Sequence, residues 1–291
     1  PNIEKFGSEK QKEKWLPKMI SGEMITGLAM TEPSVGSNLA GIQTKAVKKG
    51  DKYVVNGAKT FISNGQNGDL FIVAARTSKT GLLSPDPRKG ISMLAITSDT
   101  PGFERGRNLD KIGFHSQDTS ELFFQDAEVP VENIIGQEGK GWIYMMENLQ
   151  TERIAVAVGS VSAARGALDI TKEYVQTRKI FDKPVAAFQN TKFQLAECAT
   201  DVEIGQSFLD DILERHIAGE NLVKEVSMAK YWCSDMQFRV ADKCLQLFGG
   251  YGYMKEYPIS RHWTDARLQR IYAGTNEVMK VIIAQQIGLS K

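Results

Sequence analysis

The sequence predicts an α+β protein in which a β domain precedes a bundle of helices. In residues 25–130 the apolar side chains form short or alternating runs, separated by Gly, Asn, Asp and Pro, as in strands joined by turns. After Gly141 the apolar side chains recur three and four positions apart over long stretches, which is typical of amphipathic helices. Because the strands come before the helices and do not alternate with them, we expect separate β and helical domains.

These patterns divide the chain into three segments. Residues 1–24 form a polar helical segment, in which Ser8 is the expected N-cap and Pro17 argues against an unbroken helix. Residues 25–135 form the β domain, a barrel or two packed sheets, and residues 136–291 form a four-helix bundle. The expected strands are residues 25–30, 52–56, 59–63, 70–75, 91–96 and 121–124. The expected helices are residues 142–178 with a break near 150–151, 188–218, 223–248, 257–269 and 275–287. Residues 78–90 lack periodicity and are expected to form an exposed loop.

Composition argues against several classes of protein. The net charge is +1, so no general attraction to nucleic acid or to an anionic membrane is expected. No apolar run approaches the ~20 residues of a membrane span, and no signal peptide opens the chain, which indicates a soluble protein. Cys198, Cys233 and Cys244 form no Cys-x-x-Cys pair, which is typical of free thiols in a reducing compartment. The three histidines are too scattered for a metal site, so we expect no metal.

One stretch, residues 28–38, reads as a ligand-facing loop. It passes from an apolar run through Thr31, Glu32 and Pro33 into Ser34, Gly36 and Ser37. Hydroxyls and bare main-chain N–H groups at the end of a strand can face a ligand. Taken alone, the stretch could equally be a polar surface turn.

Further motifs follow it in a fixed order: residues 56–65, Arg178 with Phe181, residues 246–253 and residues 272–277. In this order the motifs resemble those of the acyl-CoA dehydrogenase family. Members of that family are flavoenzymes that introduce an α,β double bond into acyl thioesters. The resemblance begins near Phe6. It implies that residues 1–24 are the end of an N-terminal helical domain, most of which the chain lacks.

The resemblance also implies where the catalytic base lies. Removing a proton α to a thioester requires a base, and a carboxylate whose pKa is raised by burial suits this task. In most family members the base is a glutamate at the position occupied here by Ala273. In a subgroup similar to isovaleryl-CoA and long-chain acyl-CoA dehydrogenases the base precedes an arginine on an earlier helix, as Glu152 precedes Arg153 here. Glu152 is therefore the expected base. The alternatives are a solvated helix glutamate at that position, or Glu147 as the base.

The Ala273 main-chain N–H is expected to bind the thioester carbonyl together with a ribityl hydroxyl of the flavin. Arg153 would contact the pantetheine or support Glu152, and Gly274 would lie at the substrate. Tyr272 would be a wall of the acyl pocket, although core packing is an alternative for an aromatic residue there. Ser37 would lie near the CoA phosphates or the thioester.

The expected cofactor is FAD, although the chain has no Gly-x-Gly-x-x-Gly after a strand. By resemblance, Met30 and Thr31 line one side of the flavin, Phe61 and Ser63 line the other, and Ser37 lies near the cofactor. Phe61 and Ser63 replace the more usual Trp and Thr and keep an aromatic face and a hydroxyl. Thr275 and Glu277 match positions that hold the nucleotide, but Glu277 replaces the usual Gln, which puts a phosphate contact in doubt.

Two motif residues, Arg178 and Gln246, are expected to bind the FAD of a neighbouring subunit. Phe181, Gly249 and Gly250 are also expected at the cofactor, where the two glycines would allow the main chain to approach a partner chain or the cofactor closely. For Arg178 the alternative is a cation that only interacts with the C-terminus of its own helix. Phe181 is followed by Asp182 instead of the usual Gly, and a turn is still expected because Asp tolerates left-handed backbone.

The resemblance implies an FAD-dependent acyl-CoA dehydrogenase that passes electrons to an electron-transfer flavoprotein. It also implies a homotetramer, located in the cytoplasm of a bacterium or the mitochondrial matrix of a eukaryote. Acyl chain length is not readable from the sequence, and the resemblance to the long-chain type favours medium or long straight chains. The small residues Ala155, Ala157, Gly159 and Ser160 would leave room for a longer or branched acyl group, or would permit close helix packing instead. The alternatives are an acyl-CoA oxidase or another flavoenzyme on the same scaffold, and a non-catalytic flavoprotein.

Overall fold

The computed structural model describes residues 1–77 and 86–289. Most of the loop expected at residues 78–90 therefore lies outside the described residues. The chain divides into two compact units, each described by itself below. The first comprises Pro1–Lys111 and His115–Asn148, and the second comprises Ile112–Phe114 and Leu149–Lys291.

The first unit begins with two helices, α1 (Asn2–Phe6) and α2 (Glu9–Ser21). The predicted N-cap is confirmed, since the Ser8 hydroxyl and the Gln11 side chain form a reciprocal capping box. The break predicted at Pro17 is wrong, because α2 continues through it. Pro17 lies close to the C-terminal end of the helix, which stops at Gly22 in the left-handed conformation (φ +80°).

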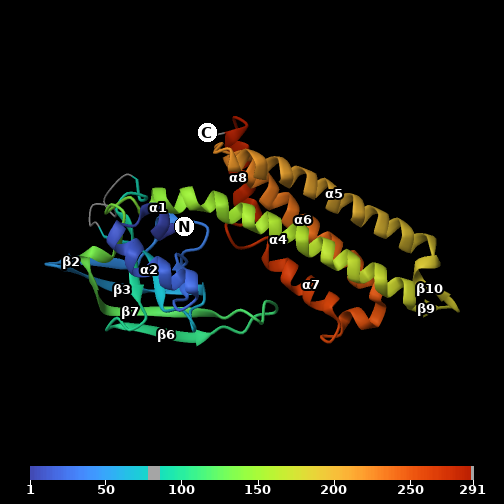
Figure 1. Cartoon of the computed structure of the whole chain (residues 1–291), viewed down its shortest axis with the longest axis horizontal. Coiled ribbons are helices and arrows are strands. Elements are labelled where there is room, and N and C mark those ends of the chain that lie inside the picture. Colours follow the sequence, from blue (N-terminus) through green and yellow to red (C-terminus); the bar gives the residue numbers. More distant parts are fainter. Residues whose placement is uncertain (78–85, 290–291) are drawn as a thin grey trace. The chain divides into compact units, whose positions relative to one another are not determined.

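An eight-stranded sheet forms the rest of this unit (Figure 1), and its order is β6-β7-β3-β2-β4-β5-β8, with β1 parallel to β4. The strands are β1 (Thr26–Ala29), β2 (Lys45–Lys49), β3 (Lys52–Ser63), β4 (Leu70–Arg76), β5 (Ile91–Thr97), β6 (Phe103–Asn108), β7 (Thr119–Pro130) and β8 (Ile134–Ile135). Short 3₁₀ turns, η1 (Leu39–Gly41) and η2 (Val131–Asn133), precede β2 and β8. The six predicted strands correspond to five in one sheet, β1, β3, β4, β5 and β7, because the runs at 52–56 and 59–63 are a single strand, β3. Three more, β2, β6 and β8, were not predicted.

Both faces of the central strands are buried. Phe71 and Val73 of β4 contribute to the core on one face, whereas Leu70 and Ile72 pack on the other face in a cluster that includes Trp15 of α2. This two-sided burial explains why β4 is apolar throughout.

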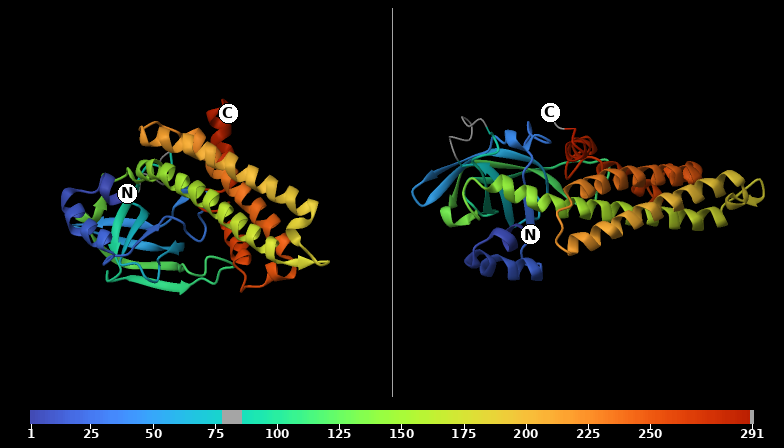
Figure 2. Two further views of the ribbon diagram at one scale, coloured as in Figure 1. Left: turned by 45° about the vertical axis from the view of Figure 1, so that its right-hand side comes forward. Right: turned by 90° about the horizontal axis from the view of Figure 1, so that it is seen from above.

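The second unit is helical. Figure 2 shows its long helices running alongside one another. They are α4 (Gly141–Thr177, whose first two turns belong to the first unit), α5 (Gln189–Ile217) and α6 (Val223–Phe248), with α7 (Pro258–Leu268) and α8 (Asn276–Gln286) packed against α6. Shorter elements connect them: β9 (Lys179–Ile180), β10 (Lys183–Pro184), η3 (Val185–Ala187) and η4 (Gly249–Tyr253). The predicted α+β order of a sheet followed by a helical domain is confirmed.

Two local predictions about this unit have different outcomes. The prediction of a break near residues 150–151 is wrong, because α4 is continuous there. Leu149 and Ile154, on either side of the predicted break, are both buried. The turn after Arg178 is confirmed: Phe181 and Asp182 have φ of +47° and +62° and connect β9 to β10, as in a type I′ hairpin.

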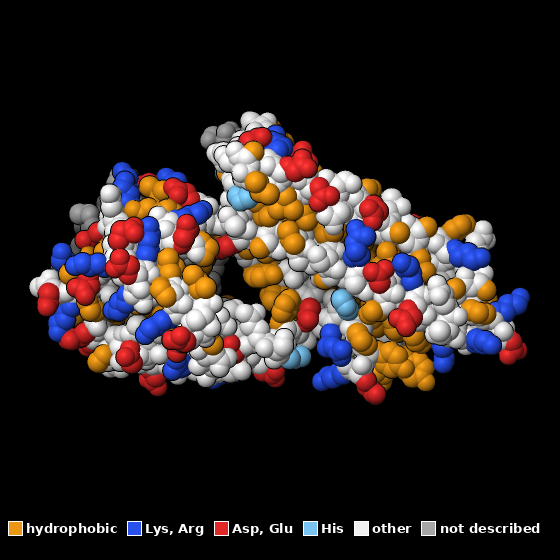
Figure 3. All heavy atoms as spheres, in the orientation of Figure 1, with side chains coloured by type: hydrophobic (Ala, Val, Ile, Leu, Met, Phe, Trp, Pro, Cys, Tyr) orange, Lys and Arg blue, Asp and Glu red, His pale blue; other side chains and the backbone are white. Residues whose placement is uncertain are grey.

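By length and composition alone α4 is apolar enough to cross a membrane, but half of its most apolar window is buried within the protein, as in the core helix of a bundle. On the face shown in Figure 3, Lys and Arg alternate with Asp and Glu. This mixture agrees with the net charge of +1.

A short segment between β6 and β7 belongs to the helical unit. Within Ile112–Phe114, the Phe114 main-chain N–H donates to Asp265 Oδ1 of α7 at 2.7 Å. Gly113 makes this approach possible, because a Cβ there would lie 2.6 Å from the same oxygen.

Candidate functional site

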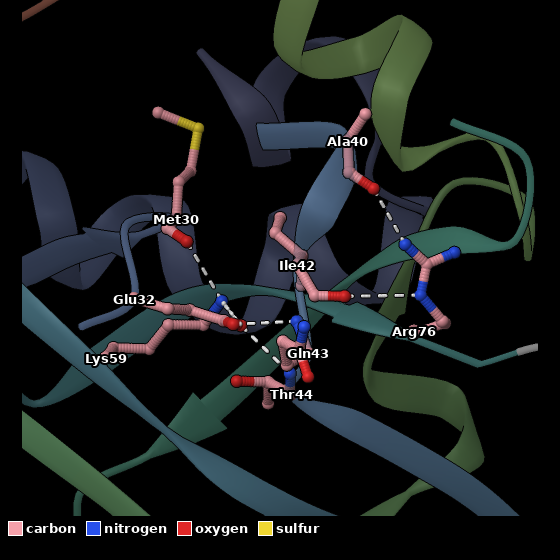
Figure 4. Close-up of polar contacts among 8 residues, drawn as sticks. All are labelled: Met30, Glu32, Ala40, Ile42, Gln43, Thr44, Lys59 and Arg76. Carbon is pink, nitrogen blue, oxygen red and sulfur yellow. Dashed lines mark hydrogen bonds and ion pairs between the residues drawn. The ribbon is translucent and has the colours of Figure 1, made fainter. Parts of the chain in front are cut away.

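In the first unit the loop after β1 is held by its main-chain carbonyls. The Lys59 ammonium donates to the Met30 carbonyl at 3.0 Å, and the Thr60 N–H donates to the Thr31 carbonyl at 3.0 Å (Figure 4 shows the first). In the described part of the chain neither the N–H nor the hydroxyl of Thr31 has a hydrogen-bond partner. Two donors on a fixed loop are thus available to a ligand.

Phe61 follows Thr60, whose N–H is hydrogen-bonded to this loop, and it has two unusual properties. Its side chain is 67% exposed, and its φ is +58°, at an irregularity in the pairing of β3 with β7. Left-handed backbone is unfavourable for a bulky residue, so it points to a functional constraint. Ser63 ends the same strand with an exposed side chain, and Ser37 is exposed on the loop that follows Glu32.

In the second unit the segment between α7 and α8 makes a sharp turn. Ala273 and Gly274 have φ of +53° and +90°. The Arg153 guanidinium, from α4, donates through Nε to the Ala273 carbonyl at 3.2 Å. The Ala273 N–H has no hydrogen-bond partner in the described part of the chain. The structure thus brings Arg153 and the predicted oxyanion donor together.

Glu152, the predicted base, is half-buried on α4. Burial raises the pKa of its carboxyl above the ordinary value, and the positive charge of Arg153 only partly opposes this. A carboxylate with a raised pKa is a stronger base toward a carbon acid. Glu147, the alternative on the same helix, is exposed.

The neighbouring residues of the turn have local partners. The Tyr272 hydroxyl donates to Gln269 Oε1 at 2.6 Å, and the Thr275 hydroxyl caps α8 by accepting from the Val278 N–H at 3.3 Å. Hydrogen bonds from its own main-chain N–H and from Thr275 lower the pKa of the exposed Glu277 carboxyl. Glu277 is therefore ionised at neutral pH, which disfavours a phosphate contact there.

A buried polar network, missed by the sequence reasoning, holds the far end of this turn. Asn276 and Lys230 are 2% and 0% exposed, and the Lys230 ammonium donates to Asn276 Oδ1 at 3.0 Å. The Asn276 amide donates to Ser234 Oγ and to Asp235 Oδ1, each at 3.0 Å. The only sequence signal was a lysine on the apolar face of a helix.

A cavity of about 780 Å³ lies at the other end of the helical unit. It is lined by Arg178 and Gln246, the two residues predicted to bind a neighbouring subunit's FAD, and by two further predicted cofactor contacts, Gly249 and Gly250. Phe181, another predicted cofactor contact, does not line it and is exposed on the adjoining hairpin. The Arg178 guanidinium stacks over the Tyr251 ring, 5.2 Å from its centroid. Among the described residues, no group of three or more His, Cys, Asp and Glu could hold a metal ion.

Three features of this cavity suit a nucleotide. Gln194 Oε1 is buried and has no hydrogen-bond partner among the described residues, as an acceptor for a ligand hydroxyl would be. Gly249 has φ +60°, and a Cβ on Gly249 or Gly250 would point into open space that a ligand can occupy. The Arg178 cation provides charge for a pyrophosphate.

Known proteins resemble this chain along nearly its whole length. Residues 1–23, 27–127 and 139–288 match the family descriptions "Acyl-CoA dehydrogenase, N-terminal domain", "middle domain" and "C-terminal domain". The mitochondrial long-chain specific acyl-CoA dehydrogenase of Sus scrofa is 44% identical over 287 residues, which cover 99% of this chain and 66% of that protein. The chain thus spans just under two thirds of the length of this relative.

Two solved structures are also similar. The acyl-CoA dehydrogenase of Geobacillus kaustophilus has a TM-score of 0.97 and 53% identity, covering 99% of this chain and 75% of that one. A chain in a structure of the electron transferring flavoprotein of Acidaminococcus fermentans has a TM-score of 0.94 and 37% identity, covering 99% and 75%. On these matches, the chain belongs to the acyl-CoA dehydrogenase family.

Proposed function

We propose that the protein is an FAD-dependent acyl-CoA dehydrogenase with Glu152 as its base. The observation that carries the proposal is the hydrogen bond from Arg153 to the Ala273 carbonyl. It links the helix position next to Glu152 with the turn whose free N–H is the expected oxyanion donor. The raised pKa of Glu152 supports the same assignment.

The residues present fit FAD, which supplies the acceptor for the β-hydride when bound. Met30, Thr31, Phe61 and Ser63 would hold the flavin ring, through the free Thr31 donors and the exposed Phe61 face. Thr275 would help to hold the nucleotide. The cavity with Arg178 would hold the pyrophosphate of the FAD of a neighbouring subunit, which supports a homo-oligomer, and we propose a tetramer.

The reaction requires two actions from this chain. Glu152 removes the α-proton, and the Ala273 N–H donates to the thioester oxygen as negative charge develops on it. Arg153 keeps the turn in the conformation that leaves this N–H free. Preorganised donors of this kind are effective because they need no rearrangement during the reaction.

For the substrate we propose medium or long straight-chain acyl-CoA thioesters, in line with the long-chain relative. Two small residues after Glu152 on α4, Ala155 and Gly159, are exposed and would leave room for such a chain, whereas Ala157 is buried in the helical core. The electron transferring flavoprotein structure that matches this chain supports such a protein as the electron acceptor.

The test is anaerobic titration of the flavin absorbance of the full-length protein with acyl-CoAs of graded length and branching. Medium or long straight chains should bleach the flavin. Glu152→Gln should slow bleaching by roughly 10²–10⁴-fold, the usual contribution of a general base. Glu147→Gln, on the same helix, is the matched control and should bleach as the wild type does. Full activity in Glu152→Gln would exclude Glu152 as the base, and bound flavin that no acyl-CoA bleaches would exclude the proposed reaction.

A further inference from the structure

A buried ion pair lies next to the loop that carries Met30 and Thr31 and is hydrogen-bonded to it. Lys59 Nζ is 2.9 Å from Glu32 Oε1, and the two side chains are 0% and 3% exposed (Figure 4). The proposed chemistry does not use either residue. Buried ion pairs are often no more stabilising than apolar side chains of similar volume, so stability alone is a weak explanation for this one.

In the described part of the chain, the other hydrogen bonds of the pair go to the main chain. Lys59 donates to the Met30 carbonyl at 3.0 Å, while Glu32 accepts from the Gln43 N–H at 2.7 Å and the Thr44 N–H at 2.9 Å. The pair therefore ties the end of β1 to β3 and to the segment before β2. It is built to fix the position of backbone.

A second buried cation belongs to the same cluster. Arg76 donates through Nε to the Ile42 carbonyl at 3.2 Å and through Nη2 to the Ala40 carbonyl at 2.9 Å, as Figure 4 shows. Burial lowers the pKa of Arg76, and attraction to Glu32 partly opposes this. Burial also lowers the pKa of Lys59, to about 8, so the ammonium is still protonated at neutral pH. With two cations and one carboxylate, the cluster has a net charge of +1.

The Met30 carbonyl and the Thr31 N–H belong to the same peptide group. A cation bonded to the carbonyl oxygen polarises that group and makes its N–H a stronger donor, because hydrogen bonds in a chain reinforce one another. The Thr31 N–H has no partner in the described part of the chain. The charge on Lys59 can thus act on whatever ligand this N–H contacts.

We propose that Lys59 is a positioning residue that polarises the Met30–Thr31 peptide and thereby favours reduced over oxidised flavin. The inference rests on the proposed function, in which Thr31 contacts the flavin. When the substrate gives up a hydride and Glu152 takes the proton, two electrons and one proton reach the flavin ring. The ring then carries one additional negative charge, which a nearby cation in a medium of low dielectric constant stabilises.

The test is the reduction potential of the bound flavin in the full-length holoprotein, measured anaerobically against reference dyes with a chemical reductant. Lys59→Met should lower the affinity for reduced relative to oxidised flavin at least tenfold, which is about 30 mV for a two-electron couple. Glu32→Gln combined with Lys59→Met should give a shift of the same sign. This double variant guards against misfolding, because it leaves no unpaired carboxylate in the core.

The matched control is Lys52→Met, which removes a lysine from the same strand whose ion pair with Glu128 is solvent-accessible. It should leave the potential unchanged. A purely structural role for Lys59 would weaken the binding of both flavin forms together and would not move the potential. The inference is wrong if the potentials of Lys59→Met and of the double variant both correspond to less than a twofold change in the ratio of affinities for reduced and oxidised flavin. Because the reductant is not a substrate, this result is independent of whether an acyl-CoA bleaches the flavin.

Discussion

The turn at Ala273 offers a sharp test of how the site is held, through the variants Ala273→Gly and Arg153→Met. Left-handed backbone costs an L-residue roughly 1–2 kcal/mol, and Gly avoids this cost. Part of the gain, roughly 0.5–1 kcal/mol, is lost because Gly also has more conformational freedom in the unfolded state. Ala273→Gly should therefore raise the free energy of unfolding by roughly 0.5–1 kcal/mol. Arg153→Met removes a charge-assisted hydrogen bond and should lower the same quantity by roughly 1.5–3 kcal/mol.

The two changes should not be additive. If Arg153 holds the turn against strain, then Arg153→Met should lower the free energy of unfolding less in the Ala273→Gly background, where the strain is gone. The double variant should then be at least about 0.5 kcal/mol more stable than the sum of the two single changes predicts. Urea unfolding followed by far-UV circular dichroism reports mainly on the helical unit and is the suitable assay. Arg165→Met, on the same helix with an exposed partner in Glu203, should not couple to Ala273.

Activity gives the second readout. Ala273→Gly keeps the N–H but loosens it, so kcat should fall about tenfold, equivalent to about 1.4 kcal/mol, with less effect on KM. Strict additivity in the unfolding cycle, or an Ala273→Gly variant that is less stable than the wild type, would refute the reasoning.

Three further predictions concern other buried or charged groups. Lys59 has a pKa of about 8 when folded and 10.5 as its ordinary value, so the unfolded state binds more protons between these limits and the free energy of unfolding should rise from pH 8 to pH 10. Urea midpoints at the two pH values should show this rise in the wild type and a smaller one in Lys59→Met. Arg178→Met should weaken FAD binding at least tenfold in a fluorescence titration, and an unchanged affinity would exclude the pyrophosphate role. Asn276→Leu should lower the free energy of unfolding by about 3 kcal/mol, because it leaves the Lys230 ammonium buried without its acceptor, and a loss below about 1 kcal/mol in urea unfolding would contradict this.

Much of the fold was predictable because buried strands and helix faces are rich in apolar residues, which can be recognised in the sequence. The central strand β4 is apolar throughout, since both its faces are covered. In contrast, β2 has a single buried residue among five, and β6 has none that is fully buried, so neither has an apolar run to detect. The continuity of α2 through Pro17 was also hidden, because one missing hydrogen bond near a helix end is easily tolerated.

The candidate site was predictable where it depends on short motifs and not where it depends on distant partners. Arg178 and Gln246 could be placed together by resemblance. The bond between Arg153 and Ala273, however, joins residues 120 positions apart, and Lys59 is separated from Glu32 by 27. A buried lysine in the sequence gives no indication of which carboxylate or carbonyl will accept its hydrogen bonds, because only the tertiary structure determines this.

The membership of Ile112–Phe114 in the helical unit bears on how the chain acquires its structure during synthesis. Phe114 is translated well before its hydrogen-bond partner, Asp265 of α7, which lies 151 positions later. This N–H of the segment between β6 and β7 therefore has to wait for its partner until α7 has left the ribosome. Contacts of such long sequence separation slow folding. Cutting the chain at any single peptide bond cannot yield both units intact, so two separately expressed halves should assemble poorly unless they are made together.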